Sequence, residues 1–117
     1  MIILENILIG LIALQHFGFL ILEMFLWTRP FGLKTFNLTK ETAQASAALA
    51  ANQGLYNGFL ASGLIWGLIS GLTSVKLFFL ACIILAGAFG GLTAKRSILY
   101  VQGLPALITL ILVLIAR

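Results

Sequence analysis

The sequence predicts an all-α integral membrane protein, a four-helix bundle that forms a single transmembrane domain over residues 1–117. The chain is 62% hydrophobic and 9% charged, with a mean hydropathy of +1.16. A soluble domain of this size leaves too much surface in water to hide so many apolar side chains. The apolar runs are continuous and not alternating, which favours helices over a membrane β-barrel. Four segments approach the ~20 residues that cross a ~30 Å hydrocarbon core.

The four predicted helices follow one another closely. The first covers residues 3–27 and ends before Pro30, with Trp27 placed like an interfacial anchor. It lacks the basic start of a secretory signal and contains Glu23, so we expect a retained span. Residues 34–42 are expected to form a polar loop. The remaining helices are expected over residues 41–69, 75–93 and 97–115, with a tight turn at residues 70–74.

The distribution of basic residues predicts the orientation in the membrane. The loops after the first and third helices carry five basic residues, whereas the opposite side carries only two, Lys76 and Arg117. Because Lys and Arg concentrate in cytoplasmic loops, we expect those two loops in the cytoplasm and both termini outside. The five basic loop residues are Arg29, Lys34, Lys40, Lys95 and Arg96.

Small residues recur every four positions in two of the predicted helices. Gly54, Gly58 and Ser62 form one stripe, and Gly87 and Gly91 form another. Such stripes let helix backbones approach closely in a membrane. They predict close packing either within the chain or between subunits.

Polar side chains inside a bilayer are costly, so each needs a partner or a water-lined cavity. At ~1.5 Å per residue, Glu23, Asn52, Gln53 and Tyr100 reach similar depths, with Arg96 one turn nearer the loops. We therefore expect a polar cluster in the cytoplasmic half, while the outer halves of the helices are almost wholly apolar. The candidate ligand-binding residues are His16, Glu23, Asn52, Gln53, Tyr56, Asn57, Arg96, Ser97 and Tyr100.

Two interpretations of this cluster stay open. It is either a buried network in which Glu23 neutralises Arg96 or Lys95, or a pocket for an anionic head group or cofactor. The sequence has no Ser-His-Asp set, phosphate loop or paired carboxylates. Any catalysis would rest on Arg96, Tyr100 and Glu23, and whether the chain is an enzyme is undecided. One His and one Cys are too few for a zinc site, and no basic–aromatic pattern favours nucleic acid.

Three stretches resemble a bacterial four-span family catalogued as domain of unknown function 1304. They are residues 14–19 (LQHFGF), 23–27 (EMFLW) and 51–61 (ANQGLYNGFLA). The resemblance covers nearly the whole chain. It implies a bacterial cytoplasmic membrane but carries no activity.

A more distant resemblance is to the membrane-associated eicosanoid and glutathione metabolism (MAPEG) superfamily. It rests on residues 50–53 (AANQ) and on residues 96–100 (RSILY) followed by Leu104-Pro105. The resemblance implies a trimer of four-helix chains with a cytoplasm-facing site between subunits, where Arg96, Ser97 and Tyr100 would contact glutathione. Asn52 or Gln53 would stand near that superfamily's helix-two Asn, but Leu55 replaces the acid expected three residues after Asn52. The architecture therefore transfers better than the chemistry.

Three classes of function follow. The first is a membrane protein that binds or modifies a lipid-like or glutathione-like ligand in a polar pocket. Its expected partners are lipid and further copies of itself. The second is a structural or partner subunit with a closed polar network. The third is a transporter or channel component, which the apolar outer halves disfavour.

Overall fold

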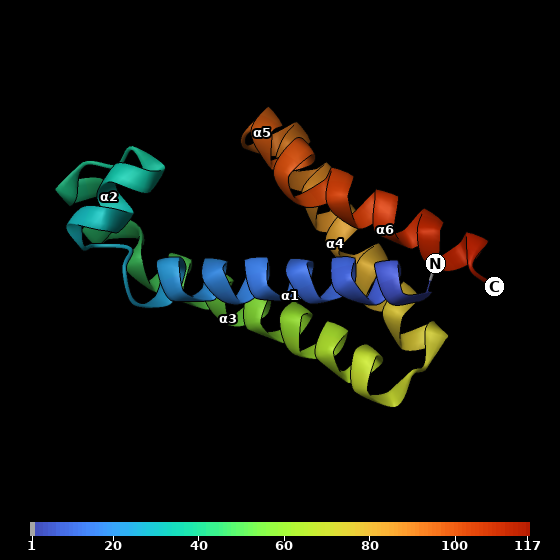
Figure 1. Cartoon of the computed structure of the whole chain (residues 1–117). Coiled ribbons are helices and arrows are strands. Elements are labelled where there is room, and N and C mark those ends of the chain that lie inside the picture. The colour runs from blue at the N-terminus through green and yellow to red at the C-terminus, as the bar shows by residue number, and fades with distance from the viewer. Residues whose placement is uncertain (1) are drawn as a thin grey trace. The chain divides into compact units, whose positions relative to one another are not determined.

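The structure, a computed structural model, describes residues 2–117 as helices joined by short turns, without a strand in that range (Figure 1). The all-α prediction is therefore confirmed. The elements are α1 (Ile2–Met24), α2 (Pro30–Phe36), α3 (Lys40–Ser70), α4 (Thr73–Thr93), α5 (Arg96–Ile98), the π-helical turn η1 (Leu99–Gly103) and α6 (Leu104–Ile115). The last three form one continuous helix.

Three of these helices are long and apolar enough to cross a membrane. They are α1, α4 and the continuous helix Arg96–Ile115. The longest helix, α3, has 31 residues, but its first half is rich in alanine and amides and only mildly apolar. A fourth span through α3 stays a prediction.

The chain divides into two compact units. One is Leu14–Ala61, and the other combines the residues up to Ala13 with Ser62–Arg117. Helices α1 and α3 each contribute to both units. The contacts within each unit are described in turn below.

Within Leu14–Ala61, the end of α1 packs against α3 at two glycines. A Cβ atom at Gly54 would lie 2.7 Å from Cγ of Met24, and one at Gly58 would lie 2.6 Å from Cδ1 of Leu20. Real Cβ contacts are longer, so neither position accepts a side chain without a shift. The two glycines of this stripe therefore pack within the chain, one of the two alternatives that the sequence left open.

The segment after α1 is more ordered than the sequence predicts. Pro30 was expected to stop the first helix, but it occupies the first turn of α2, where a proline needs no N–H partner. The expected loop at residues 34–42 shrinks to the few residues between Phe36 and Lys40. Trp27 Nε1 donates a hydrogen bond of 3.0 Å to Ser46 Oγ, which ties the α1 end to α3. The expectation of a loop was wrong because Pro was read only as a terminator.

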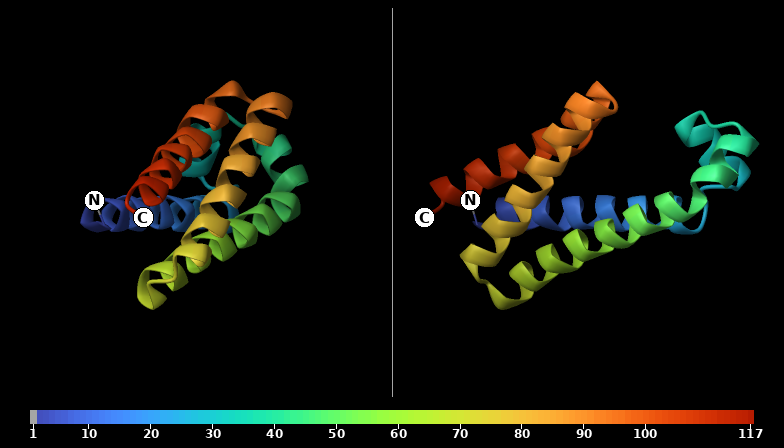
Figure 2. Two further views of the ribbon diagram at one scale, coloured as in Figure 1. Left: turned by 90° about the vertical axis from the view of Figure 1, so that its right-hand side faces the viewer. Right: turned by 180° about the vertical axis from the view of Figure 1, so that it is seen from behind.

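In the second unit, α4 and the last helix form a close hairpin, visible in both views of Figure 2. The backbones meet at Gly87, where a Cβ would lie 2.6 Å from Cα of Gly103. Gly91 faces Leu99 in the same way, at 2.7 Å from its Cβ. The second glycine stripe therefore also packs within the chain.

A π-helical turn interrupts the last helix just before Pro105. Proline has no N–H for the carbonyl of Val101, and its ring crowds that carbonyl. The helix widens instead, and the Leu104 N–H donates to the carbonyl of Leu99, five residues earlier. Such turns occur frequently at functional sites because they change the direction of nearby side chains.

Candidate functional site

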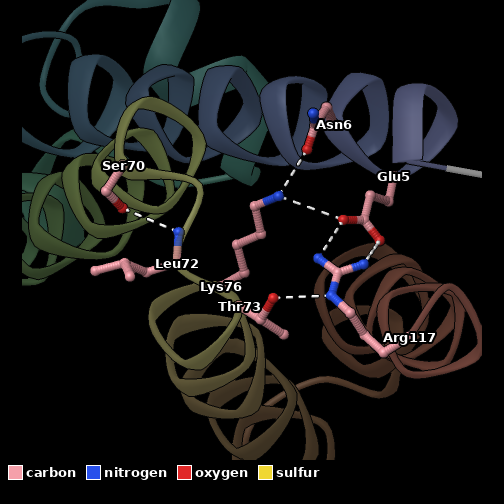
Figure 3. A network of polar contacts seen from close by, with 7 residues as sticks. All are labelled: Glu5, Asn6, Ser70, Leu72, Thr73, Lys76 and Arg117. Carbon is pink, nitrogen blue, oxygen red and sulfur yellow. Dashed lines mark hydrogen bonds and ion pairs between the residues drawn. The ribbon is translucent and has the colours of Figure 1, made fainter.

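A buried carboxylate joins three distant parts of the second unit (Figure 3). Glu5, in the first turn of α1, is fully buried and forms ion pairs with Lys76 at 3.3 Å and with Arg117 at 2.9 Å. Lys76 also donates to Asn6 Oδ1 at 2.9 Å, and Arg117 Nε donates to Thr73 Oγ1 at 2.8 Å. The beginning of α1, the beginning of α4 and the end of the chain therefore meet at one place.

Sequence reasoning missed this cluster, which we call the Glu5 network (Glu5, Asn6, Thr73, Lys76 and Arg117). It treated Lys76 and Arg117 only as loop charges and expected the outer halves of the helices to be apolar. The structure contradicts that expectation at this end, because Lys76 is buried within α4. One sequence feature could have predicted this network: Glu5 and Lys76 each lie about one turn inside an apolar helix. Opposite charges at such positions need partners inside the protein.

A second polar contact lies in the Leu14–Ala61 unit. The Asn57 side-chain amide donates a hydrogen bond to Glu23 Oε1, joining the end of α1 to α3. One of the two sequence interpretations has Glu23 neutralise Arg96 or Lys95. Those basic residues belong to the other unit, and that pairing stays a prediction.

The other predicted site residues of this unit differ in their exposure to solvent. His16 is fully buried, and its ring meets Phe19 edge to face at 5.2 Å. Asn52, Gln53 and Tyr56 are exposed on α3, although Asn57 one residue beyond Tyr56 is buried. Asn57 alone of these four residues therefore faces α1.

Three predicted residues lie together at the start of the last helix, at the turn that follows α4 (Figure 1). Arg96 and Tyr100 are one helical turn apart on one side of the helix. Ser97 directly follows Arg96 and points about 100° away from it around the helix, three residues before Tyr100. All three are exposed, Tyr100 to 57%. A guanidinium and two hydroxyls that project from one helix face can bind a phosphate or carboxylate group. We call these residues the Arg96 face (Arg96, Ser97 and Tyr100).

One pocket of the Ser62–Arg117 segment has a different character. It is an open apolar depression of about 270 Å³, lined by Trp66, Ser74, Val75, Phe78 and Phe79. None of the predicted ligand-binding residues contributes to it. Every fully buried polar side-chain atom in the described part of the chain has a hydrogen-bond partner.

These features define a class: a small all-helical protein with membrane-length apolar helices and a buried ion-pair network at the ends of two of them. The chain belongs to a family described as "Protein of unknown function (DUF1304)", whose sequence profile matches residues 10–114. This confirms the resemblance to that family.

The chain is also similar to a bacterial protein described as "Uncharacterized protein YpaA", from Lactococcus lactis subsp. lactis (strain IL1403). The two are 35% identical over 115 residues, which cover 95% of this chain and 97% of that protein. No solved structure matches the chain. The resemblance to the MAPEG superfamily stays a prediction.

Proposed function

We propose that the chain is a four-span protein of the bacterial cytoplasmic membrane that binds the anionic group of a lipid-like or glutathione-like molecule through the Arg96 face. The single observation that carries the binding proposal is that face itself. Its three polar side chains are exposed next to a helix long and apolar enough to cross a membrane. Exposed Arg and Tyr side chains at a helix end are typical of the boundary between lipid and water, where phosphate groups lie.

The Glu5 network supports an even number of membrane crossings. It joins the beginning of α1 to the end of the chain through the Glu5–Arg117 ion pair. If α1 crosses the membrane, both ends of the chain therefore lie on the same face. Three crossings would separate these ends, and in this proposal the long helix α3 supplies the fourth. At ~1.5 Å per residue its 31 residues extend about 46 Å, which exceeds the ~30 Å hydrocarbon core.

Basic residues support the orientation of these four spans. Lys76 and Arg117, on the face assigned to the outside, are both paired with Glu5. Lys95 and Arg96 form no ion pair within their own unit, so we infer that their charges are available to anionic lipid. This difference reinforces the assignment of the α4–α5 turn to the cytoplasmic face.

The resemblance to the MAPEG superfamily supports a binding site at the Arg96 face. In that resemblance, Arg96, Ser97 and Tyr100 occupy positions that contact glutathione. A lipid phosphate and the carboxylates of glutathione share the chemistry that an arginine recognises, since both accept paired hydrogen bonds from a guanidinium. The proposal therefore specifies an anionic group, and the two sources must be distinguished by experiment.

Native mass spectrometry in mild detergent tests the proposal, with phosphatidylglycerol, phosphatidylcholine and glutathione as separate probes. We expect the protein to bind either phosphatidylglycerol or glutathione in preference to phosphatidylcholine, and Arg96→Gln to weaken that binding by about tenfold or more. Arg29→Gln, which removes an exposed basic residue outside the Arg96 face, is the matched control and should bind as the wild type does. Equal binding of all lipids, unchanged by Arg96→Gln, would contradict the proposal.

A second candidate function is that of a structural or partner subunit. It is favoured by the complete pairing of buried polar atoms and by the apolar character of the described pocket. The same experiment separates the two candidates. Absence of any ligand from both wild type and Arg96→Gln would leave the structural subunit as the better proposal.

A further inference from the structure

Helix α3 retains an exposed face that contains an amide side chain at its centre. Ala45, Asn52 and Phe59 lie seven residues apart along this face, and Ala48 and Leu55 lie between them. All five are exposed, Phe59 to 56% and Leu55 to 41%. We call these residues the α3 seam. Their alternating spacing of three and four residues is that of a helix contact in a left-handed coiled coil.

Asn52 is the unusual member of the seam. Its side chain forms no hydrogen bond within the Leu14–Ala61 unit, unlike Asn57 on the other side of α3. Asn52 is 18 residues from the end of α3 at Ser70, or about 27 Å along the helix axis. In the proposed membrane orientation it thus lies inside the ~30 Å hydrocarbon core. Lipid tails offer no partner for an amide there.

We propose that the α3 seam binds the same seam of a second copy of this chain, with the Asn52 amides hydrogen-bonded to each other. An amide carries both a donor and an acceptor, so two symmetry-related Asn side chains satisfy one another. A single Asn within an otherwise apolar seam is known to fix helix register and the number of associated helices. This inference rests on the membrane placement in the proposed function but not on the ligand.

The residues on either side of Asn52 fit this contact. Ala45 and Ala48 are small and let the two helix backbones approach at one end of the seam. Leu55 and Phe59 provide larger apolar side chains at the other end. The glycines of α3 do not compete for this role, because Gly54 and Gly58 already pack against α1. The helix therefore uses its glycine stripe within the chain and presents its seam to a second copy.

Cysteine cross-linking in native membranes tests the contact directly, in a Cys82→Ser background that removes the natural cysteine. We expect oxidation to link copies that carry Ala48→Cys or Leu55→Cys, because a disulfide requires Cα atoms within about 7 Å of each other. Gln53→Cys is the matched control. Gln53 is equally exposed but points about 100° away from Asn52 around the helix, so it should not link.

Association in reconstituted bilayers, measured by energy transfer between labelled copies at several dilutions, tests the amide. We expect Asn52→Leu to weaken association roughly three- to tenfold. The conservative Asn52→Gln should retain most of it, and Gln53→Leu should leave it unchanged. Equal losses from Asn52→Leu and Gln53→Leu, or cross-linking with no preference for the seam positions, would overturn the proposal.

Membrane extraction at alkaline pH separates failure of this inference from failure of the proposed function. A protein that stays in the membrane fraction but does not associate contradicts only the seam contact. A protein that is released into the soluble fraction contradicts the membrane placement on which both proposals depend.

Discussion

The ammonium group of Lys76 lies 3.3 Å from the carboxylate of Glu5, a residue 71 positions earlier in the chain. Both side chains are almost completely inaccessible to solvent. This pair places the beginning of α4 beside the beginning of α1. The partly exposed Arg117 adds the end of the chain to the same point. The Glu5 network thus restrains the topology of the protein as well as contributing to its stability.

Replacing Glu5 should destabilise the protein strongly. Glu5→Gln leaves Lys76 buried without an opposite charge, and removal of one partner from a buried pair typically costs about 3–5 kcal/mol. Because Arg117 is partly exposed and can turn toward solvent, we expect a loss near the lower end, about 3 kcal/mol. Chemical unfolding in detergent, followed by circular dichroism, measures this loss.

The matched control for Glu5→Gln is the double variant with Lys76→Met, which also removes the stranded cation. The double variant should be more stable than Glu5→Gln alone, because the two changes act on one interaction. If the two losses simply added, the ion pair would contribute nothing to stability and this interpretation of the network would be wrong.

The hydrogen bond from Asn57 to Glu23 should stabilise the Leu14–Ala61 unit. Asn57→Leu removes the donor and leaves the half-buried Glu23 carboxyl without its partner, so we expect a loss of about 1–3 kcal/mol. Gln53→Leu removes an exposed amide from the same helix and should change the unfolding free energy by less than about 0.5 kcal/mol. Indistinguishable unfolding curves for the two variants would show that the Asn57 contact is unimportant.

The close approach of α4 to the last helix should make Gly87 intolerant of a side chain. A Cβ there would meet the Gly103 backbone at 2.6 Å, so Gly87→Ala must push the two helices apart. Overpacking of this kind typically costs about 1–3 kcal/mol. Thermal unfolding in detergent measures the effect.

Gly10→Ala provides the control, since a Cβ at Gly10 has no atom within 4 Å. That variant should unfold at the wild-type temperature or slightly above it, because alanine favours the helix. A wild-type transition for Gly87→Ala would contradict the close packing of the hairpin.

Pro105 should control the direction of the Arg96 face. Pro105→Ala restores the missing N–H, so the π-helical turn can return to a regular α-helix. Removing one extra residue from a turn rotates the preceding side chains by about 100° relative to α6. We expect weaker binding of the anionic probe with little loss of thermal stability, measured on the same sample. Unchanged binding would show that the π-helical turn does not position Arg96, Ser97 and Tyr100.

The sequence predicted features that depend on local patterns of residues, and it did not predict which distant residues come into contact. Continuous apolar runs predicted the all-α class, since only helices satisfy the backbone along such segments in lipid. The glycine repeats predicted close packing but not its partners, because spacing alone does not identify the facing residue. The structure assigns Gly54 to Met24 and Gly87 to Gly103.

The errors in the sequence analysis arose where a residue has two roles. Pro30 was expected only to stop the first helix, whereas in the structure α1 ends earlier, at Met24, and Pro30 begins α2. Lys76 was counted as a loop charge, although it lies buried in α4 beside Glu5. The hydrogen bond from Asn57 to Glu23 was missed because it depends on how α1 and α3 pack, which depth along a helix does not determine.

The crossing of α3 is the central claim, and labelling of single cysteines in intact cells tests it most directly. In a Cys82→Ser background, Leu72→Cys reports the turn between α3 and α4, Lys34→Cys reports α2, and Ala94→Cys reports the turn after α4. A membrane-impermeant maleimide should label Leu72→Cys in intact cells, and should label Lys34→Cys and Ala94→Cys only after permeabilisation. Labelling of Leu72→Cys and Lys34→Cys from the same side would show that α3 does not cross the membrane and would contradict the four-span account.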